Sequence, residues 1–242
     1  MTLLAIDAGN TRIKWGAHAN GQWLQRDALP TAQTDRLSEA LAPWRAATRA
    51  VVANVAGERV AHALRAALGE APVIEWVQGR PEQCGVRSSY AEPAQLGADR
   101  WAALIGARHL FDLPCVVVNV GTTMTVDALS GESIFLGGCI VPGFDLMRAA
   151  LDANTARLKL REGEFRFFPD NTGDAIASGA INALAGAIER MRGYMMESGE
   201  ADPLAVLSGG NAAVLAGHVS APAQVVDNLV LEGLLRIGTT ES

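Results

Sequence analysis

The sequence predicts a mixed α/β protein built from two similar halves, each with a β-sheet covered by helices. Three observations lead to this prediction. The chain opens on consecutive strands joined by tight turns, helical and short apolar segments then alternate, and the opening motif returns near the middle of the chain. Strand hairpins followed by helical crossovers produce sheets that contain both antiparallel and parallel strands.

The first half opens with three predicted strands. Apolar segments at residues 2–7 and 11–18 are separated by a short polar stretch, and the turn signal Asn20-Gly21 precedes a strand that begins at Gln22. A helix, a strand, a second helix and a second strand follow at 34–46, 50–55, 57–68 and 72–77. This order predicts a mixed sheet with helices packed on it.

The opening motif returns 112 residues later, because Asp7 aligns with Asn119 and Gly9 aligns with Gly121. In the same alignment, Asn10 and Thr11 meet Thr122 and Thr123. Both copies lead into a glycine turn, and a tandem duplication explains the repeat better than chance does. We therefore expect an N-terminal half at 1–112 and a C-terminal half at 113–242, the second with helices at 144–153, 174–198 and 226–237 and a strand at 204–210.

Composition and charge narrow the function classes. Of 242 residues, 49% are hydrophobic and 19% are charged, which is typical of a compact globular protein. The net charge of -6 provides no general attraction for phosphate backbones, so we expect no nucleic-acid partner. Cys84, Cys115 and Cys139 form no C-x-x-C pair, and no apolar stretch is long enough to span a bilayer. These features predict reduced thiols, a cytoplasmic location and no membrane partner.

The stretch from Asp7 to Thr11 raises the question of why a strand would end on an acid, two small residues and an Asn-Thr pair. Gly9 permits close approach of the backbone to a ligand, and Asp7 is suited to hold a hydrated Mg²⁺ ion beside a polyphosphate. An ordinary hairpin turn also favours Gly, Asn and Asp. The second copy, from Asn119 to Thr123, favours a nucleotide held by two such loops.

A further glycine pair lies in LSGGNA, from Leu207 to Ala212, where a predicted strand ends and a helix begins. Backbone amides at such a junction suit an adenosine or phosphate contact. A plain turn at the start of a helix would have the same composition.

The segment from Gly97 to Phe111 has the apolar spacing of a helix, with Asp99 and Arg100 in its first turn. In a structural interpretation, Asp99 complements the positive helix N-terminus and Arg100 is solvated. In a catalytic interpretation, Asp99 accepts a proton from an attacking hydroxyl group and Arg100 binds a substrate carboxylate. Taken alone, this segment favours the structural interpretation.

Together, these motifs resemble the type III pantothenate kinases, a family also known as Bvg accessory factors. The resemblance covers nearly the whole chain, with the motifs in the same order and at compatible spacings. The motifs are Asp-x-Gly-Asn-Thr at Asp7 to Thr11, Gly-x-Asp-Arg at Gly97 to Arg100, the pair Gly121-Thr122, NTGDAIASG at Asn171 to Gly179, and LSGGNA.

The resemblance implies an actin-like fold with two ribonuclease-H-like halves and ATP in the cleft. It implies ATP-dependent phosphorylation of pantothenate to 4′-phosphopantothenate, the first step of coenzyme A biosynthesis, by a homodimer that uses Mg²⁺ and K⁺ or NH₄⁺. The residues implied for ATP are Asp7, Ala8, Gly9, Asn10, Thr11, Arg12, Ile13, Lys14 and Thr122. Those implied for pantothenate are Tyr90, Gly97, Ala98, Asp99, Arg100 and Thr172, with Asp99 as the proton acceptor.

Two of these residues have simpler interpretations. Thr172 is also placed to cap the helix that begins near residue 174, and Tyr90 is also compatible with a packed aromatic side chain. The function has alternatives too. Another small-hydroxyl kinase or a polyphosphate hydrolase of the same superfamily would share the motifs, as would a non-catalytic regulator that supports transcription. The intact pair Asp99-Arg100 favours the enzyme.

One position departs from the family pattern. Family members commonly carry an aspartate where this chain has Asn119, and that aspartate helps to hold the monovalent cation. Asparagine keeps an oxygen ligand but loses the charge, so we expect this enzyme to need much more potassium than its relatives, or none. Asp127 compensates only if the hairpin bends it back, because an extended segment would place it about 25 Å away.

The long predicted helix at 174–198 is a candidate dimer contact. Its apolar positions follow helical spacing, and small residues nearby permit close approach of another helix. These positions are Ile176, Ala180, Ile181, Leu184, Ile188 and Met191.

Overall fold

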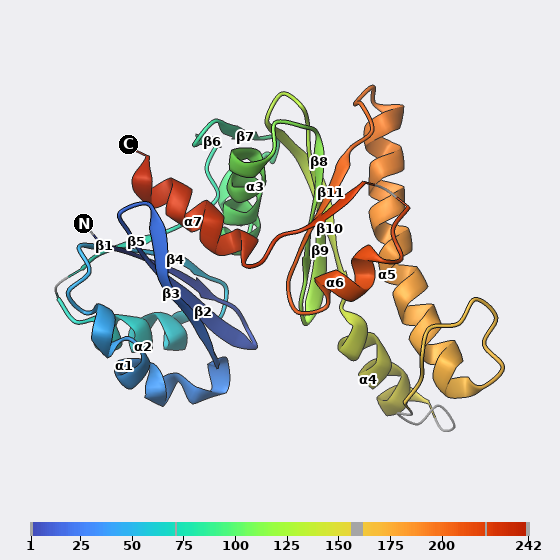
Figure 1. Ribbon diagram of the computed structural model, residues 1–242, viewed down its shortest axis with the longest axis horizontal. Helices are drawn as coiled ribbons and strands as arrows, with labels where there is room; N and C mark the ends of the chain where they lie inside the picture. Colours follow the sequence, from blue (N-terminus) through green and yellow to red (C-terminus); the bar gives the residue numbers. More distant parts are fainter. Residues whose placement is uncertain (1, 71, 156–161, 221, 241–242) are drawn as a thin grey trace. The chain divides into compact units, whose positions relative to one another are not determined.

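The computed structural model describes residues 2–70, 72–155, 162–220 and 222–240. The chain forms two compact units (Figure 1). Unit 1 joins Met1–Asp112 to Asn228–Ser242, and unit 2 is Leu113–Asp227. Within the described ranges, no helix has both the length and the apolar character needed to cross a bilayer.

Unit 1 is built on a mixed sheet with the strand order β3-β2-β1-β4-β5. Its strands are β1 (Thr2–Ala8), β2 (Arg12–Ala19), β3 (Gln22–Pro30), β4 (Arg49–Asn54) and β5 (Val73–Trp76). The first three form an antiparallel meander, and β4 and β5 join it in parallel. The sheet contains both antiparallel and parallel pairs, so the predicted mixed sheet is confirmed. The parallel pairs need the crossover connections that the helices provide.

The segment predicted as one helix at 34–46 is broken into short pieces. These are the 3-10 helix η1 (Thr31–Arg36), the α-helix α1 (Leu37–Ala40) and the 3-10 helix η2 (Ala42–Trp44). Gln33 has a non-helical φ of -105° and ψ of 39°, and Pro43 has no backbone N–H with which to continue an α-helical ladder. The helix predicted at 57–68 is confirmed as α2 (Glu58–Leu68).

The two faces of the first sheet have different surroundings. Ile6 and Trp15 lie in a core that also contains Leu64 of α2. Because successive side chains of a strand point to opposite faces, Asp7 and Lys14 lie on the other face. The candidate site residues of β1 and β2 are thereby separated from this core.

Two helices of unit 1, α3 (Ala98–Leu110) and α7 (Leu229–Thr239), pack against each other. Glycine makes this close packing feasible, because a Cβ atom on Gly233 would overlap the carbonyl oxygen of Ala102. The helix α7 also contacts β1 and β4. The sequence placed 228–242 in the C-terminal half, and the structure assigns this segment to unit 1, since its apolar side chains are buried against α3 and the first sheet.

A short hairpin and a 3-10 turn precede α3. They are β6 (Glu82–Gln83), β7 (Val86–Ser88) and η3 (Pro93–Gln95). Cys84 and Gly85 form the turn of the hairpin with φ angles of 51° and 81°. Positive φ at both central residues is the geometry that matches the twist of paired strands.

Unit 2 repeats the strand order of unit 1, because its strands run β12-β11-β8-β9-β10. They are β8 (Cys115–Val120), β9 (Thr123–Leu129), β10 (Ile134–Pro142), β11 (Leu204–Ser208) and β12 (Ala223–Val225). Again the first three are antiparallel and the last two join in parallel. The shared topology supports the tandem duplication expected from the motif repeat.

The helices of unit 2 are α4 (Phe144–Asn154), α5 (Thr172–Glu197) and α6 (Ala212–Ala216). Leu184 and Ile188 of α5 lie in the core of this unit with Val118 and Val126. The apolar row expected to mediate dimerisation therefore packs largely inside its own chain.

Candidate active site

Hydrogen bonds from two sides hold the turn between β1 and β2. The N–H of Gly9 donates to Arg12 O at 3.0 Å. The Thr31 hydroxyl donates to Gly9 O at 2.7 Å, and the Thr31 N–H donates to Thr11 O at 2.9 Å. Sequence analysis did not select Thr31, because no local motif marks it and only the return of β3 beside β2 brings it to the turn.

Asp7 lies close to this turn, in β1, and its side chain is 8% exposed. Its cross-strand partner is Lys14. Burial raises the pKa of Asp7 to about 7, the Lys14 ammonium group opposes that shift, and the Asp99 carboxylate adds to it. A carboxyl group in these surroundings favours a bound cation or a proton, since either removes the cost of a buried charge.

Asp99 lies in the first turn of α3, two residues after the cap residue Gly97. Its Oδ1 accepts a hydrogen bond from the N–H of Arg100 at 2.8 Å. A Cβ atom on Gly97 would lie 2.7 Å from that oxygen, so glycine makes room for the carboxylate. Burial raises the pKa of Asp99 above its usual range, and the N–H and charge of Arg100 oppose the shift. The effect of Asp99 on the pKa of Asp7 places these two carboxylates of unit 1 within electrostatic range of each other.

Arg100 follows Asp99 and is 8% exposed. The expectation that Arg100 is solvated is therefore wrong. Its Nη1 lies 3.5 Å from the Tyr90 hydroxyl oxygen, which is at the long limit for a hydrogen bond. Unit 1 thus places Tyr90 beside Arg100, although they are ten residues apart in the sequence.

Between Asp7 and Lys14, some side chains are exposed at the turn and others are buried in the core. Asn10, Thr11 and Arg12 are exposed at the turn. Ala8 and Ile13 are each 0% exposed and lie in the core, so only their main-chain groups are available to a ligand.

The equivalent turn of unit 2 joins β8 to β9. The N–H of Gly121 donates to Thr123 O at 3.1 Å, and the N–H of Gly143 donates to Thr122 O at 2.9 Å. The equivalent cross-strand pairs of the two units are Asp7 with Lys14 and Asn119 with Thr125. The first turn therefore has one more residue than the second, and Arg12, rather than Thr11, is the counterpart of Thr123.

Asn119 of β8 lies between Ser208 of β11 and Thr125 of β9. Asp127 pairs with Val117, two positions along the same ladder, and is 1% exposed. An extended segment would place Asp127 about 25 Å from Asn119, but the condition set for compensation by Asp127 is met. The hairpin folds Asp127 back onto the same sheet face as Asn119, and diagonal neighbours of this kind are about 7–8 Å apart.

Gly209, the first glycine of LSGGNA, has a packing explanation. Gly209 has a φ of 106°, and a Cβ atom there would overlap the carbonyl oxygen of Val120. The helix α6 begins at Ala212, after Asn211, which makes no side-chain cap. Close contact with β8 and a positive φ account for Gly209 without a ligand.

Thr172 is the first residue of α5, and it is not the residue that caps this helix. The side chain of Asn171 accepts a hydrogen bond from the N–H of Asp174 at 3.0 Å and provides the cap. The role suggested for Thr172 as the cap is therefore wrong. Thr172 itself is half-buried at the start of α5.

The donor set suits a magnesium ion bound mainly by water and phosphate. Among the described residues, no group of three or more His, Cys, Asp or Glu side chains is arranged to hold a metal ion. Mg²⁺ at phosphoryl-transfer sites commonly uses one or two carboxylates, several waters and the substrate phosphates. Asp7, with Asp99 nearby, fits that pattern.

Comparison with known proteins decides the family. The profile described as type III pantothenate kinase matches residues 3–193. The chain is 50% identical over 235 residues to the type III pantothenate kinase of Aromatoleum aromaticum, and the match covers 96% of each protein. The chain belongs to the type III pantothenate kinase family. The type III pantothenate kinase of Nitrosospira multiformis is 44% identical over 241 residues, with 99% of this chain and 92% of that protein covered. The predicted family is confirmed.

Solved structures show the same fold at low sequence identity. A Baf family protein of Campylobacter jejuni matches this chain with a TM-score of 0.64 and 21% sequence identity. The match covers 97% of this chain and 96% of that chain. An activator of 2-hydroxyisocaproyl-CoA dehydratase from Clostridium difficile has a TM-score of 0.53 and 13% identity, and the match covers 98% of this chain and 92% of that chain. The predicted actin-like α/β fold, with mixed sheets flanked by helices, is confirmed.

Proposed function

We propose that this chain transfers the γ-phosphoryl group of ATP to pantothenate and forms 4′-phosphopantothenate, the first step of coenzyme A biosynthesis. The family match along residues 3–193 carries this proposal. The carboxyl groups of buried Asp7 and half-buried Asp99, which interact electrostatically, support it. Phosphoryl transfer depends on a positioned cation, a positioned nucleophile and neutralised phosphate charge, and two carboxylates can serve the first two needs.

Asp99 is the proposed proton acceptor for the primary alcohol of pantothenate. Its raised pKa brings it closer to neutral pH, where a general base works best. The hydrogen bond from Arg100 N–H to Oδ1 holds one carboxylate oxygen in place, which leaves Oδ2 for the substrate hydroxyl.

The turn from Asp7 to Lys14 is the proposed phosphate site. Exposed Asn10, Thr11 and Arg12 supply donors at the turn, and Lys14 supplies a positive charge on the face of Asp7. Asp7 would hold Mg²⁺, directly or through water, and the ion would neutralise charge on the transferred phosphate.

Arg100 and Tyr90 are proposed to bind the carboxylate and polar groups of pantothenate, together with Gly97, Ala98 and Thr172. A buried guanidinium group offers a rigid fork that matches a carboxylate. Thr122 is proposed to contact ATP from the second turn, where its carbonyl oxygen is already engaged by Gly143 N–H.

The proposed monovalent cation would use Asn119 as an oxygen ligand. The side-chain carbonyl of asparagine suits K⁺ but carries no charge, so binding should be weaker than with aspartate. Asp127 brings a carboxyl group to the same sheet face as Asn119, at a diagonal position. Partial compensation by Asp127 is therefore part of this proposal.

A homodimer remains the proposed assembly, through a surface other than the buried row of α5. Phe167 and Phe168 are 86% and 94% exposed, which is unusual for large apolar side chains. Close by, the N–H of Arg166 donates to the Ser178 hydroxyl of α5 at 2.9 Å and fixes this segment to the helix. Replacing both phenylalanines with serine should convert the dimer to a monomer in analytical ultracentrifugation, and an unchanged dimer would contradict the choice of surface.

The central experiment measures ADP release by the purified protein with and without pantothenate. We expect release that depends on pantothenate, with 4′-phosphopantothenate as the product in mass spectrometry. Equal release without pantothenate would indicate a polyphosphate hydrolase instead. Binding of ATP without turnover of any hydroxyl substrate would favour the regulatory alternative.

A further inference from the structure

Thr31, the first residue of η1, holds the β1–β2 turn from a buried position. It is 5% exposed, although its side chain is polar. Its hydroxyl donates to Gly9 O at 2.7 Å, and its N–H donates to Thr11 O at 2.9 Å. Both acceptors are main-chain oxygens of the proposed phosphate site, whereas Thr31 itself is nearly inaccessible to a ligand. Any effect of Thr31 on that site must therefore pass through the turn.

The bond to Gly9 O fixes the orientation of the peptide unit between Gly9 and Asn10. This peptide is trans, and a trans peptide is planar with its C=O and its N–H pointing in opposite directions. Because Gly9 O is directed at Thr31, the N–H of Asn10 is directed away from Thr31. Within the described residues, this N–H donates to no acceptor, and Asn10 is exposed. The turn therefore presents an unused main-chain donor.

The N–H of Arg12 is a second main-chain donor of this turn. In an ordinary β-turn, the N–H of the fourth residue often donates to the C=O of the first. Here Gly9 N–H donates to Arg12 O, but the described part of the chain has no return bond from Arg12 N–H to Gly9 O. Arg12 and Pro30 form a non-hydrogen-bonded pair of the ladder, so the Arg12 N–H also points away from β3. Thr31 thus takes the acceptor that would otherwise close the turn.

We propose that Thr31 is a positioning residue for ATP. Its hydroxyl holds the Gly9–Asn10 peptide in the orientation that lets the Asn10 N–H donate to a phosphate oxygen. Main-chain N–H groups of such turns form common anion sites, and a charged acceptor strengthens each hydrogen bond. This inference rests on the proposed function, because it takes the turn as the phosphate site. Thr31 itself does not contact the nucleotide.

The peptide needs this restraint because its two residues tolerate rotation well. Rotation changes ψ of Gly9 and φ of Asn10, and glycine and asparagine are residue types that readily adopt the resulting angles. Without the hydroxyl, Gly9 O would lose its donor, and rotation would give this oxygen access to water. The rotated peptide would direct a carbonyl oxygen, rather than an N–H, at the phosphate. ATP binding would then lose an attraction and gain a repulsion.

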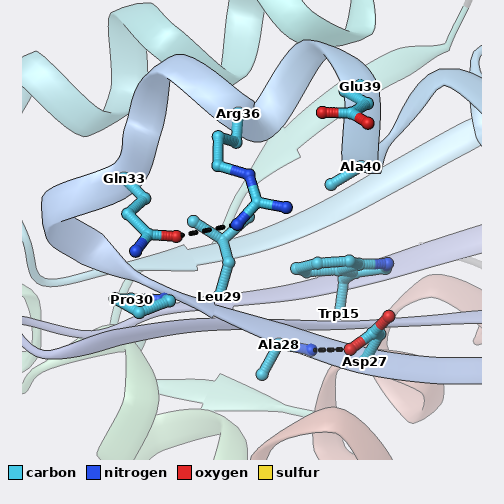
Figure 2. A pocket seen from close by; sticks show the side chains of 9 residues that line it. All are labelled: Trp15, Asp27, Ala28, Leu29, Pro30, Gln33, Arg36, Glu39 and Ala40. Atoms are coloured by element: carbon cyan, nitrogen blue, oxygen red, sulfur yellow. Dashed lines mark hydrogen bonds between the residues drawn. The ribbon is translucent and has the colours of Figure 1, made fainter.

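The segment η1 gives the hydroxyl a fixed base. Pro30, whose ring restricts φ, precedes Thr31 and has a φ of -61°. Leu37, directly after η1, is 1% exposed in the core of unit 1. Along η1, the side chain of Arg36 donates to the side-chain oxygen of Gln33 at 3.1 Å (Figure 2). These two residues line a cavity of about 380 Å³ beside η1, but Thr31 does not, so its substitution leaves the cavity lining intact.

Thr31→Val tests the proposal, because it removes the hydroxyl but keeps the N–H bond to Thr11 O and a branched side chain of similar shape. In steady-state kinetics of the full chain, we expect the KM for ATP to rise about tenfold, a loss of about 1.4 kcal/mol. The KM for pantothenate should stay unchanged. Thr31→Ser keeps a hydroxyl and should restore most of the ATP affinity. Thr31→Ala should match Thr31→Val, so the result does not depend on how valine fits.

Thr34→Val is the matched control, because it makes the same substitution in the same segment. The Thr34 hydroxyl accepts a hydrogen bond from Arg59 of α2 at 3.3 Å. It should leave both KM values unchanged. An effect of Thr34→Val on ATP equal to that of Thr31→Val would show that general loosening of η1 is responsible and would overturn the proposal. Wild-type KM for ATP in Thr31→Val, or failure of Thr31→Ser to restore it, would also overturn it.

A binding measurement separates this proposal from the proposed function. In NMR spectra of the chain with ¹⁵N-labelled asparagine, ATP and Mg²⁺ should shift the main-chain signal that Asn10→Ser removes. The shift should be much smaller in Thr31→Val at saturating ATP. If the wild type binds ATP but releases no ADP with pantothenate, the proposed function fails, while these spectra still decide the role of Thr31. An equal shift in wild type and Thr31→Val, or no ATP binding by either protein, would overturn the positioning role.

Discussion

Asp7 of β1 and Lys14 of β2 face each other directly across the antiparallel ladder that precedes the first turn. The ammonium group opposes the shift, but burial still raises the pKa of Asp7 to about 7. One opposite charge therefore does not compensate for removal of this carboxylate from water.

This environment predicts how stability depends on pH. The unfolded chain loses the Asp7 proton near pH 4, whereas the folded chain keeps it until about pH 7, so the folded state binds more protons in between. The contribution of Asp7 to the free energy of unfolding should fall as pH rises through this window. Asp7→Asn should remove that fall and stabilise the ligand-free protein at pH 8 by up to about 4 kcal/mol, at about 1.4 kcal/mol per pKa unit.

Urea unfolding at pH 4, 6 and 8 without nucleotide or Mg²⁺ provides the measurement. Asp35→Asn, at an exposed position, is the control and should follow the wild-type curve. A constant difference between Asp7→Asn and wild type at all three pH values would show that Asp7 does not titrate in this window.

Asp99→Asn preserves the size of the side chain but removes the proton acceptor. Turnover should fall by about 10²-fold or more, the usual contribution of general base catalysis, while ATP binding survives. Asp112→Asn is the matched control, because Asp112 is exposed just beyond the end of α3 and, among the described residues, its salt bridge is to Arg108 at 3.1 Å. Wild-type turnover in a folded Asp99→Asn protein would exclude Asp99 from the mechanism.

Arg100→Lys keeps the charge and loses the planar fork. We expect the KM for pantothenate to rise about tenfold or more while the KM for ATP barely changes. Tyr90→Phe removes a hydroxyl oxygen that lies 3.5 Å from Arg100, a weak contact at best, so its effect should be smaller. Weaker ATP binding with unchanged pantothenate binding in Arg100→Lys would assign this residue to the nucleotide instead.

Asn119→Asp introduces a carboxylate at the proposed site of the monovalent cation. A unit charge pair at 4 Å is worth about 4 kcal/mol at an effective dielectric constant of 20, so the variant should reach saturation at a much lower potassium concentration than wild type. Activity across a potassium series, starting from potassium-free buffer, measures this difference. Asp127→Asn in the same series tests compensation from the diagonal position. Low-potassium saturation of the wild type that neither variant alters would refute the charge argument.

Gly233→Ala tests the contact between α3 and α7. The added methyl group would overlap the carbonyl oxygen of Ala102, so we expect a loss of about 1–3 kcal/mol in the free energy of unfolding. Gly193→Ala is the control within another helix, since a Cβ atom there meets no atom within 4 Å. This control should gain up to about 1 kcal/mol from better helix propensity. Similar effects of both substitutions would mean that α7 moves readily away from α3.

The sequence by itself determined the elements whose signals are local. Apolar runs, the turn signal Asn20-Gly21 and the Gly-x-Asp-Arg motif predicted most strands of both sheets, the first hairpin and α3. The short strands β6, β7 and β12 were not predicted. The motif repeat also predicted a duplicated topology, because both copies begin the same strand order. The helical pattern at 34–46 misled because apolar periodicity says nothing about the non-helical backbone at Gln33 or the missing N–H of Pro43.

Only the tertiary structure decided the features that depend on partners distant in the sequence. It assigned α7 to unit 1, because its glycine and apolar side chains fit α3, which lies more than a hundred residues earlier. It brought Asp127 back to the sheet face of Asn119 through strand register, and it placed Thr31 on the β1–β2 turn. It also buried Arg100, which the sequence alone favoured as a solvated side chain. Burial and register arise from contacts between segments, and periodicity within one segment contains no information about them.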